Sequence, residues 1–436
     1  MSAEAKRVVI TGAGIISPIG TDVESVWSSL DQGKSGIGPI QNLPTDCLPF
    51  NAGGEVSEFT GAIGDYGELD KKLMRAIKKG SKIMCREIEM GVAASQKAIA
   101  HSGLPADRSS DRCGCIFGCD YILTRPEEYE DGMRNCIREM GEFELNQWPE
   151  HGLSKVNPLW LLKYLPNMPN SHVAIYNDFR GPNNAITTRE ASMGHALAEA
   201  TSIIQRGAAD VMLVGATGSR IHPLRTAQVA ISEQLASQQE DPTTMVRPFD
   251  STADGTALGE GAGALIIESL DYAQSRGANI LGEVIGSGAA MVGPNGGENF
   301  LEQATYRSLS AAIASCGDKL PASWHLHANG LGCPDIDAEE SKAIGRVLGE
   351  REVPVTAAKS YFGNLGCGGV AIELICSLLA LQHDNLFPIR NLQSPADHVT
   401  WRPAKPGESA GDAFIHNSFT LQGQAVSLAI SKFLAA

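Results

Sequence analysis

The chain has 436 residues and a formal net charge of −15, with 43% hydrophobic and 19% charged residues. So acidic a chain argues against nucleic acid as the main partner, because phosphate backbones are bound by basic surfaces. Its apolar runs fall short of the roughly 18 residues that a membrane-spanning helix needs, so we expect no membrane span and no membrane partner.

The ten cysteines are not spaced like the ligands of a zinc site. Cys113, Cys115 and Cys119 cluster in CGCIFGCD, a segment typical of a strand and turn. Free thiols suit a reducing compartment, and the chain enters its first strand without an apolar leader. We therefore expect a cytoplasmic protein without a metal or another cofactor.

Apolar strands alternate with helices along the chain. In the first half the pattern predicts a strand at 7–14, a helix at 22–33, a helix at 88–103, a strand at 113–118, a helix at 194–207, strands at 209–216 and 263–270, and a helix at 270–277. In the second half it predicts a strand at 280–290, a helix at 303–317, a strand at 323–330, helices at 338–349 and 365–382, and strands at 413–419 and 425–433.

The second series of elements repeats the first in a similar order. This indicates an internal duplication with layered sheets and helices, one half at 1–272 and the other at 273–436. Residues 120–170 are charged and aromatic, and they read as an excursion from the regular layers.

The stretch ITTREASMGHALAEA, residues 186–200, resembles the sharp strand-to-helix turn on which many enzymes mount a nucleophile. Its tip carries Glu190, a carboxylate where a thiol or hydroxyl is expected. The turn therefore marks a candidate site whose ordinary chemistry has changed.

Three separated blocks resemble the β-ketoacyl-[acyl carrier protein] synthases of the elongating type, within the thiolase-like superfamily. They are KRVVITGAGIISPIGTDVESVWSSLDQGKSGIGPI (6–40), GAADVMLVGA (207–216) and RPFDSTADGTALGEGAGALIIE (247–268). They occur in the family's order, and the resemblance covers essentially the whole chain. It implies an α/β fold of five layers, α-β-α-β-α, built from two similar halves and working as a two-fold dimer.

The same resemblance assigns the family's catalytic positions. The family's nucleophilic Cys falls on Glu190, counted from the Gly-Pro pair at 181–182. Its two His residues fall on Asn329 in ANGLGCPDID and on Asn364 in KSYFGN. The Gly-Phe-Gly-Gly loop that lines the acyl entrance in the family is replaced by Thr420, Leu421, Gln422 and Gly423.

Other family positions are retained. Lys359 stays in the Lys-Ser block, and Asp337 and Glu340 stay in the acidic helix start after Asn329. In the family this Lys pairs with this Glu near the site, so we expect a Lys359–Glu340 salt bridge that belongs to the scaffold behind the active site.

Ordinary condensation needs a thiolate and two imidazoles, and Glu190 cannot hold a stable acyl thioester. One hypothesis is a non-condensing subunit like the family's chain-length factors, which lack the Cys and often carry Gln there. Glu190 could then hold two subunits together through a polar contact, for example with Arg189, or block the pocket. A second hypothesis is an altered acyl-thioester enzyme, an acyltransferase or decarboxylase, that uses Glu190 with Asn329 and Asn364 as hydrogen-bond donors.

A variant of the enzyme hypothesis uses another thiol. Cys333 lies four residues after Asn329, and Cys367 lies three residues after Asn364. Either thiol could face the pocket, although a packed small residue is the more common role of such a cysteine.

The expected partner is a second subunit, either another copy of the chain or an intact ketosynthase. The run VNPLWLLKYLPNMP (156–169) is expected to be covered largely by that subunit; its apolar residues are Trp160, Leu161, Leu162, Tyr164 and Leu165. An acyl carrier protein is a further candidate, because the segment 70–86 carries Lys71, Lys72, Arg75, Lys78, Lys79 and Lys82. Glu233, however, stands where the family's docking segment has Arg, which reverses the charge there.

Overall fold

The computed structural model describes residues 6–46, 48–137 and 141–434. Eleven of the described strands form one mixed sheet in the order β11-β10-β9-β12-β13-β8-β1-β7-β6-β4-β5. Their bounds are β1 Val8–Ile16, β4 Cys113–Cys119, β5 Asn183–Ile186, β6 Val211–Ser219, β7 Glu260–Ser269, β8 Gly282–Met291, β9 Trp324–His327, β10 Pro354–Thr356, β11 Arg402–Pro403, β12 Ala413–Phe419 and β13 Gln424–Ser431. A separate pair joins β2 Gly38–Pro39 to β3 Ala52–Gly53.

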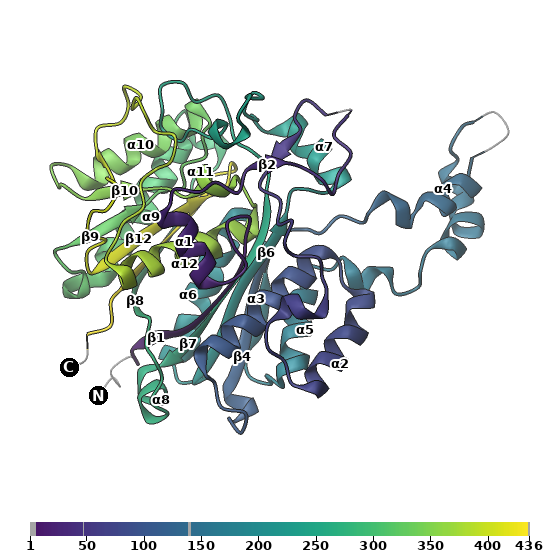
Figure 1. Ribbon diagram of the computed structural model, residues 1–436, viewed down its shortest axis with the longest axis horizontal. Coiled ribbons are helices and arrows are strands. Elements are labelled where there is room, and N and C mark those ends of the chain that lie inside the picture. The colour runs from purple at the N-terminus through teal and green to yellow at the C-terminus, as the bar shows by residue number, and fades with distance from the viewer. Residues whose placement is uncertain (1–5, 47, 138–140, 435–436) are drawn as a thin grey trace.

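Most of the helices lie on the faces of this sheet and between its halves, while α4 lies in a projecting arm (Figure 1). Their bounds are α1 Val23–Asp31, α2 Lys71–Gly80, α3 Arg86–Ser102, α4 Glu130–Asn135, α5 Met168–Asn177, α6 Ser192–Gln205, α7 Pro223–Ser232, α8 Leu270–Ser275, α9 Phe300–Cys316, α10 Pro334–Leu348, α11 Lys359–Phe362 and α12 Cys367–His383. None of the described helices is long and apolar enough to cross a bilayer.

The sheet consists of two halves with the same pairing pattern. In the first half β1 pairs antiparallel with β7, β7 antiparallel with β6, and β6, β4 and β5 are parallel. In the second half β8, β13, β12, β9 and β10 repeat these directions in the same order. The predicted duplication is therefore confirmed.

The two halves meet at β1 and β8, where Val9 pairs with Glu283 and Ile10 with Gly282. The predicted boundary at 272/273 falls within α8, which connects β7 to β8. That 1–272 and 273–436 are separate domains stays a prediction.

Helix α12 and helix α6 form the middle layer, since both contact strands of the two halves. Helices α3 and α5 cover the outer face of the first half, and α9 and α10 cover that of the second. A helix with protein on all sides is apolar all round, and α12 is buried from Cys367 to Leu381. Gly368 permits its close approach to β7, because a Cβ there would lie 2.1 Å from the Gly261 carbonyl oxygen. The predicted five-layer α-β-α-β-α architecture is confirmed.

The predicted excursion at 120–170 forms an arm that projects from the layered body (Figure 1). Its described residues form short helical turns and α4, and the segment ends at the start of α5. The apolar run at 156–169 is partly packed inside the chain: Tyr164 belongs to the core of the first half, and the Trp160 ring meets Tyr129 edge-on at 5.5 Å. Leu161 and Leu159 remain exposed. Coverage of this run by a second subunit stays a prediction.

Candidate functional site

Glu190 lies where the turn passes into α6, as the sequence predicted. It belongs to a single helical turn, Arg189–Ala191, immediately before Ser192. Arg189 has φ 51°, a left-handed backbone conformation that residues other than Gly seldom adopt. The buried Ser192 hydroxyl accepts the Thr188 N–H at 2.8 Å and so fixes the turn. Glu190 is thus presented by a tight, locally strained loop.

The Glu190 carboxylate is held by Arg220, the residue that follows β6. The Arg220 Nη2 group donates to Glu190 Oε1, and its Nη1 group donates to Glu233 Oε2 at 2.6 Å. The three side chains are nearly buried, with 7% exposure for Arg220, 12% for Glu190 and 9% for Glu233. Burial alone lowers the pKa of the Arg220 guanidinium, but the charges of Glu233 and Glu190 outweigh it and raise the pKa above its usual range.

This Glu190–Arg220–Glu233 triad bears on two interpretations of the sequence. Within the chain Glu190 pairs with Arg220, and the Arg189 guanidinium lies 6.0 Å from the centre of the Tyr121 ring. A contact between subunits that involves Arg189 stays a prediction. Glu233 is an internal partner of the same arginine, so it does not form an exposed acidic patch at the expected docking segment. Arg220 carried no sequence signal beyond its place at the end of an apolar strand.

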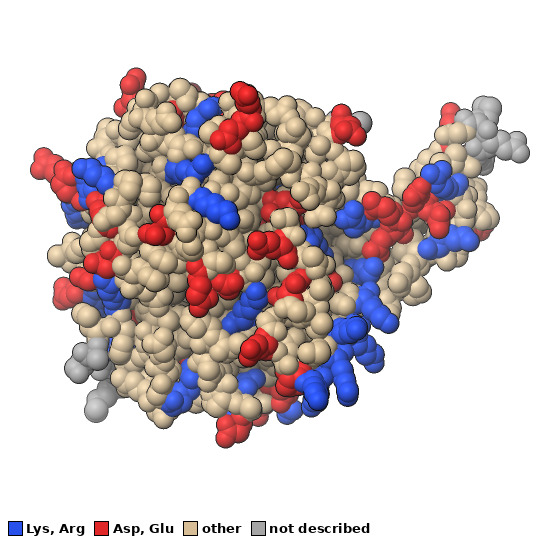
Figure 2. All heavy atoms as spheres, viewed as in Figure 1, with Lys and Arg blue, Asp and Glu red and all other residues tan. Residues whose placement is uncertain are grey.

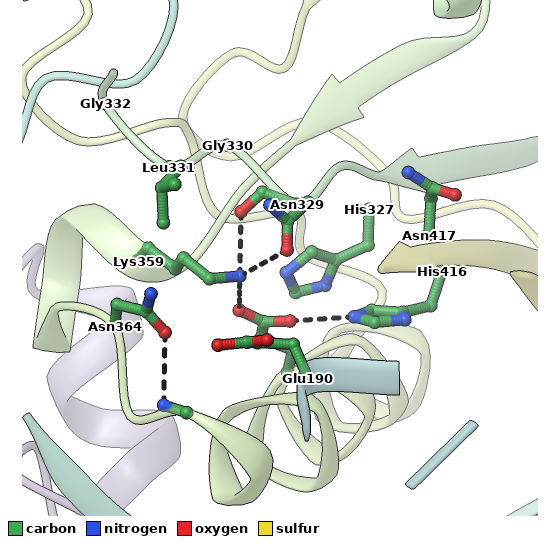
Figure 3. A network of polar contacts seen from close by, with 12 residues as sticks. Glu190, His327, Asn329, Gly330, Leu331, Gly332, Lys359, Asn364, His416 and Asn417 are labelled. Carbon is green, nitrogen blue, oxygen red and sulfur yellow. Dashed lines mark hydrogen bonds and ion pairs between the residues drawn. The ribbon is translucent and has the colours of Figure 1, made fainter. Parts of the chain in front are cut away.

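A chain of contacts connects the triad to Asn364. Arg220 lies beside Gly366, where a Cβ would come within 3.3 Å of the Arg220 Nε atom. The Gly366 N–H donates to Asn364 Oδ1 at 3.1 Å. Gly366 also has φ 64°, so a side chain there would be strained as well as crowded. Figure 3 shows Glu190, Asn364 and Asn329 within one close view.

Asn329 is joined to Lys359 in the same view (Figure 3). The Lys359 ammonium donates to the Asn329 carbonyl oxygen and to its Oδ1 atom, both at 2.9 Å. Its third hydrogen bond goes to Glu373 Oε1 at 2.6 Å. The expected Lys359–Glu340 salt bridge is therefore wrong: the ion-pair partner of Lys359 is Glu373. A lone charge inside the apolar helix predicted at 365–382 was the signal that could have indicated it, because a fully buried Glu requires a partner.

Glu340 and Asp337 instead shape the loop that carries Asn329. Glu340 accepts the backbone N–H groups of Asn329 at 2.7 Å and Gly330 at 2.9 Å. Burial raises the pKa of Glu340 in spite of these bonds. Glu340 thus holds the backbone of this loop in position, and Asp337 does the same for the next part of it.

Asp337 binds the next part of the same loop. It accepts the N–H of Leu331 at 3.0 Å, that of Gly332, and that of Phe249 at 2.9 Å from the preceding segment. Burial raises the pKa of Asp337 to about 7.

The pKa of Glu373, the ion-pair partner of Lys359, changes in the other direction. Burial alone would raise it, but the Lys359 ammonium and His416 lower it to about 2.

The space beside Arg220 is small. A cavity of about 10 Å³ is bordered by Arg220, Cys119, Asp120 and Cys367, which is room for about one water molecule. An acyl chain would need the surrounding side chains to move. The side chains around Arg220 therefore leave little free space at this end of the site.

Neither candidate thiol is prepared for nucleophilic attack. Cys333 is 1% exposed and Cys367 is 0% exposed. Burial raises the pKa of both thiols far above the usual range, so the reactive thiolate is disfavoured. Cys113, Cys115 and Cys119 lie in β4, as predicted, and are also buried.

The entrance-loop positions form the tight turn between β12 and β13. The Thr420 N–H donates to the Gln424 carbonyl oxygen at 2.8 Å, and Gly423 N–H donates to that of Thr420 at 2.9 Å. The Gly423 carbonyl accepts from Val292, just after β8. Leu421 is half-buried and Gln422 is exposed. A role of these four residues in substrate binding stays a prediction.

Comparison with known proteins gives the family. Residues 5–273 match the model of the β-ketoacyl synthase N-terminal domain, and residues 281–393 match that of the C-terminal domain. A 3-oxoacyl-[acyl-carrier-protein] synthase 2 from Synechocystis sp. is 31% identical over 99% of this chain and 99% of its own length. The protein of the same name from Staphylococcus aureus strain N315 is 32% identical over 90% of each chain.

Solved structures show the same thiolase-like ketosynthase fold. The ishigamide ketosynthase/chain length factor superimposes with a TM-score of 0.80 at 24% identity, over 99% of this chain and 100% of that one. A β-ketoacyl synthase from Burkholderia phymatum STM815 superimposes with a TM-score of 0.82 at 22% identity, over 98% and 100%. With family models matched along most of its length and this fold, the chain belongs to the β-ketoacyl synthase family.

Proposed function

We propose that this chain is a non-condensing subunit of fatty-acid or polyketide-type synthesis that pairs with an intact ketosynthase, in the manner of a chain-length factor. The observation that carries the proposal is the Glu190–Arg220–Glu233 triad. A carboxylate at the nucleophile position cannot form a stable acyl thioester, and Arg220 holds this carboxylate in an ion pair. The site is therefore a rigid surface that takes no part in a reaction.

The arm supports the pairing. A groove of about 320 Å³ runs along it between Tyr129, Trp148 and Trp160. Leu145 and Leu153 border the groove and are 73% and 54% exposed. Apolar surface of this kind on a projecting element is typical of a protein interface. A cytoplasmic setting fits the unpaired cysteines of the described chain.

Co-expression with a Cys-His-His ketosynthase from the same source tests this pairing. We expect the two chains to co-purify, and we expect Leu145→Asp with Leu153→Asp to separate them. Ile231→Asp is the matched control, because Ile231 is 89% exposed but lies on α7. If the chain only self-associates, or if both variants behave alike, the proposed heterodimer is wrong.

An acyl carrier protein is the proposed second partner. Six of the seven basic residues of the segment 70–86 are exposed, most of them on α2, while Arg86 is half-buried and pairs with Glu260. Figure 2 shows Lys and Arg gathered over this region. A basic face on an acidic chain suits an acidic partner. Lys78→Glu with Lys79→Glu should weaken carrier binding by about tenfold or more at low salt. Lys34→Glu, an exposed site after α1, should leave it unchanged.

The altered acyl-thioester enzyme remains the second candidate because of one observation. The side-chain NH₂ groups of Asn329 and Asn364 donate no hydrogen bond in the described part of the chain, while their oxygens accept from Lys359 and Gly366. Two free donors could bind an oxyanion. Against it stands Glu190, which is tied to Arg220 and so is a poor base.

Incubation with acyl-pantetheine thioesters distinguishes the two candidates. The non-condensing subunit should show no acyl adduct by intact-protein mass spectrometry and no consumption of the thioester. An adduct on Cys333 or Cys367, or turnover that Glu190→Gln abolishes, would favour the enzyme.

A further inference from the structure

Three buried side chains of the second half converge behind the Asn329 loop. His327 ends β9, Glu373 lies in α12 and His416 lies in β12, and each is 0% exposed. One ring nitrogen or carboxylate oxygen from each lies within 4.8 Å of the others. Figure 3 shows His327 and His416 beside Lys359. These three residues lie far apart along the chain, and the cysteine spacing that led us to expect no metal carries no information about them.

A sequence of hydrogen bonds fixes the tautomer of His327. His325 Nδ1 lies 2.7 Å from the Ala410 carbonyl oxygen, which can only accept, so Nδ1 carries the proton. In a neutral His325 ring, Nε2 is then the acceptor, and the Ser377 hydroxyl lies 3.1 Å from it. The Ser377 oxygen then accepts the N–H of His327 Nδ1 at 2.7 Å. His327 is left with a bare lone pair on Nε2.

That lone pair meets no hydrogen-bond donor in the described chain, although it is fully buried. An unsatisfied buried polar atom is costly, so it requires an explanation. A neutral imidazole whose other nitrogen donates to an orienting group is the form in which His binds a metal ion. His416 offers a second imidazole, with Nε2 at 2.9 Å from Glu373 Oε2 and with an unpartnered Nδ1.

The balance of nearby charges also favours one more cation. Glu373 and Glu340 are two buried carboxylates, and the Lys359 ammonium is the one lysine or arginine side chain that bonds to either in the described chain. Lys359 binds Glu373 through Oε1, which leaves Oε2 turned toward His416. A buried negative charge without full compensation is unfavourable, so a further positive charge would be stabilised here.

We propose that His327, Glu373 and His416 bind a divalent transition-metal ion such as Zn²⁺. Two imidazoles and one carboxylate are a known ligand set for such ions, and hard cations such as Mg²⁺ prefer oxygen. Bonds of about 2.0–2.1 Å in tetrahedral geometry require ligand atoms about 3.3 Å apart, so small shifts of the three side chains suffice. The ion would join β9, β12 and α12 behind the Asn329 loop and stabilise the second half.

Metal analysis of the intact protein tests the site. Because all three ligands are buried, exchange is slow, so the protein is expressed in Zn²⁺-supplemented medium and dialysed against a weak chelator before measurement. We expect about one zinc per chain in the wild type, a higher melting temperature than in protein stripped by prolonged chelation, and below about 0.1 zinc per chain in His327→Gln and His416→Gln.

His172→Gln is the matched control. His172 is also buried with an unpartnered Nε2, but it lies on α5 in the first half, and zinc content should not change. Co²⁺ substitution in the wild type gives a second readout that needs no variant: the spectrum should show nitrogen and oxygen ligands. Wild type with less than about 0.1 zinc per chain, unchanged zinc in His327→Gln, or a cobalt–thiolate band would overturn the proposal.

Discussion

Two ionic groups, one in each half of the molecule, lie around the candidate site and are built differently. In the first, Arg220 binds the carboxylates of Glu190 and Glu233, and all three side chains retain 7–12% exposure. In the second, Lys359 binds Glu373 with 4% and 0% exposure, and also binds Asn329. The first group consists of side chains alone, while the second is also anchored to backbone atoms.

This difference separates the two groups by what each of them holds in place. The Lys359 group orients the Asn329 loop and sits against the middle helix α12, so it is part of the scaffold. The Arg220 triad fixes only the turn at Glu190 and the Glu233 segment. If Glu190 occupies a nucleophile position, as we propose, a carboxylate with its own counter-ion can stand there while the buried network behind it stays in place.

The largest effect is expected from Lys359→Met, which leaves Glu373 buried without its ion-pair partner. Removal of one member of a buried pair costs about 3–5 kcal/mol of unfolding free energy. The matched control is Lys359→Met combined with Glu373→Gln, which should recover part of that loss because no unpaired charge remains. Urea unfolding measures both, and a loss below about 1 kcal/mol for the single variant would contradict the scaffold role.

The same variant should change the pH dependence of stability. In the wild type the pKa of Glu373 is lowered to about 2, so its contribution is present above the unfolded pKa and is lost only as pH falls through about 2. Without Lys359 the buried carboxyl takes up a proton more readily, so its folded pKa rises and stability decreases as pH rises. We expect the difference in unfolding free energy between wild type and Lys359→Met to be smaller at pH 4 than at pH 7, roughly by half or more. Urea unfolding at the two pH values checks this, and a constant difference would show that charge is not the cause.

Arg220→Met is expected to lose less unfolding free energy, about 2–3 kcal/mol, because the carboxylates of Glu190 and Glu233 keep some access to water. Adding Glu190→Gln and Glu233→Gln should restore most of the stability, since the neutral triple variant has no unpaired charge. If Arg220→Met costs more than Lys359→Met in the same urea experiment, the ranking of the two groups is reversed and the comparison fails.

The smallest effect on stability is expected from Glu190→Gln, a loss of about 0.5–1.5 kcal/mol of unfolding free energy, because the amide oxygen still accepts from Arg220. The same urea experiment measures this loss.

Glu190→Cys should not gain condensation of acyl and malonyl thioesters, because neither Asn329 nor Asn364 can act as an imidazole base. A radiochemical condensation assay with an intact ketosynthase as the positive control measures this. Detectable product from Glu190→Cys would mean that the asparagines suffice.

The amino-acid sequence by itself determined the family, the layered fold and its duplication. Hydrophobic periodicity is local, so the strand predicted at 413–419 is β12 with the same bounds, and the helix predicted at 365–382 is α12 within two residues. The short strands β5, at the edge of the first half, and β10, near the edge of the second half, were not predicted, because four and three residues carry little pattern.

Only the tertiary structure decided which charges meet. The sequence correctly placed Glu190 at the start of α6, but it assigned Lys359 to Glu340 and treated Glu233 as a surface charge. Arg220 is separated from Glu190 by α6 and β6, and Glu373 reaches Lys359 and His416 only after α12 packs against the second half of the sheet. Ion-pair partners depend on these non-local contacts, and a pattern along the chain does not contain them.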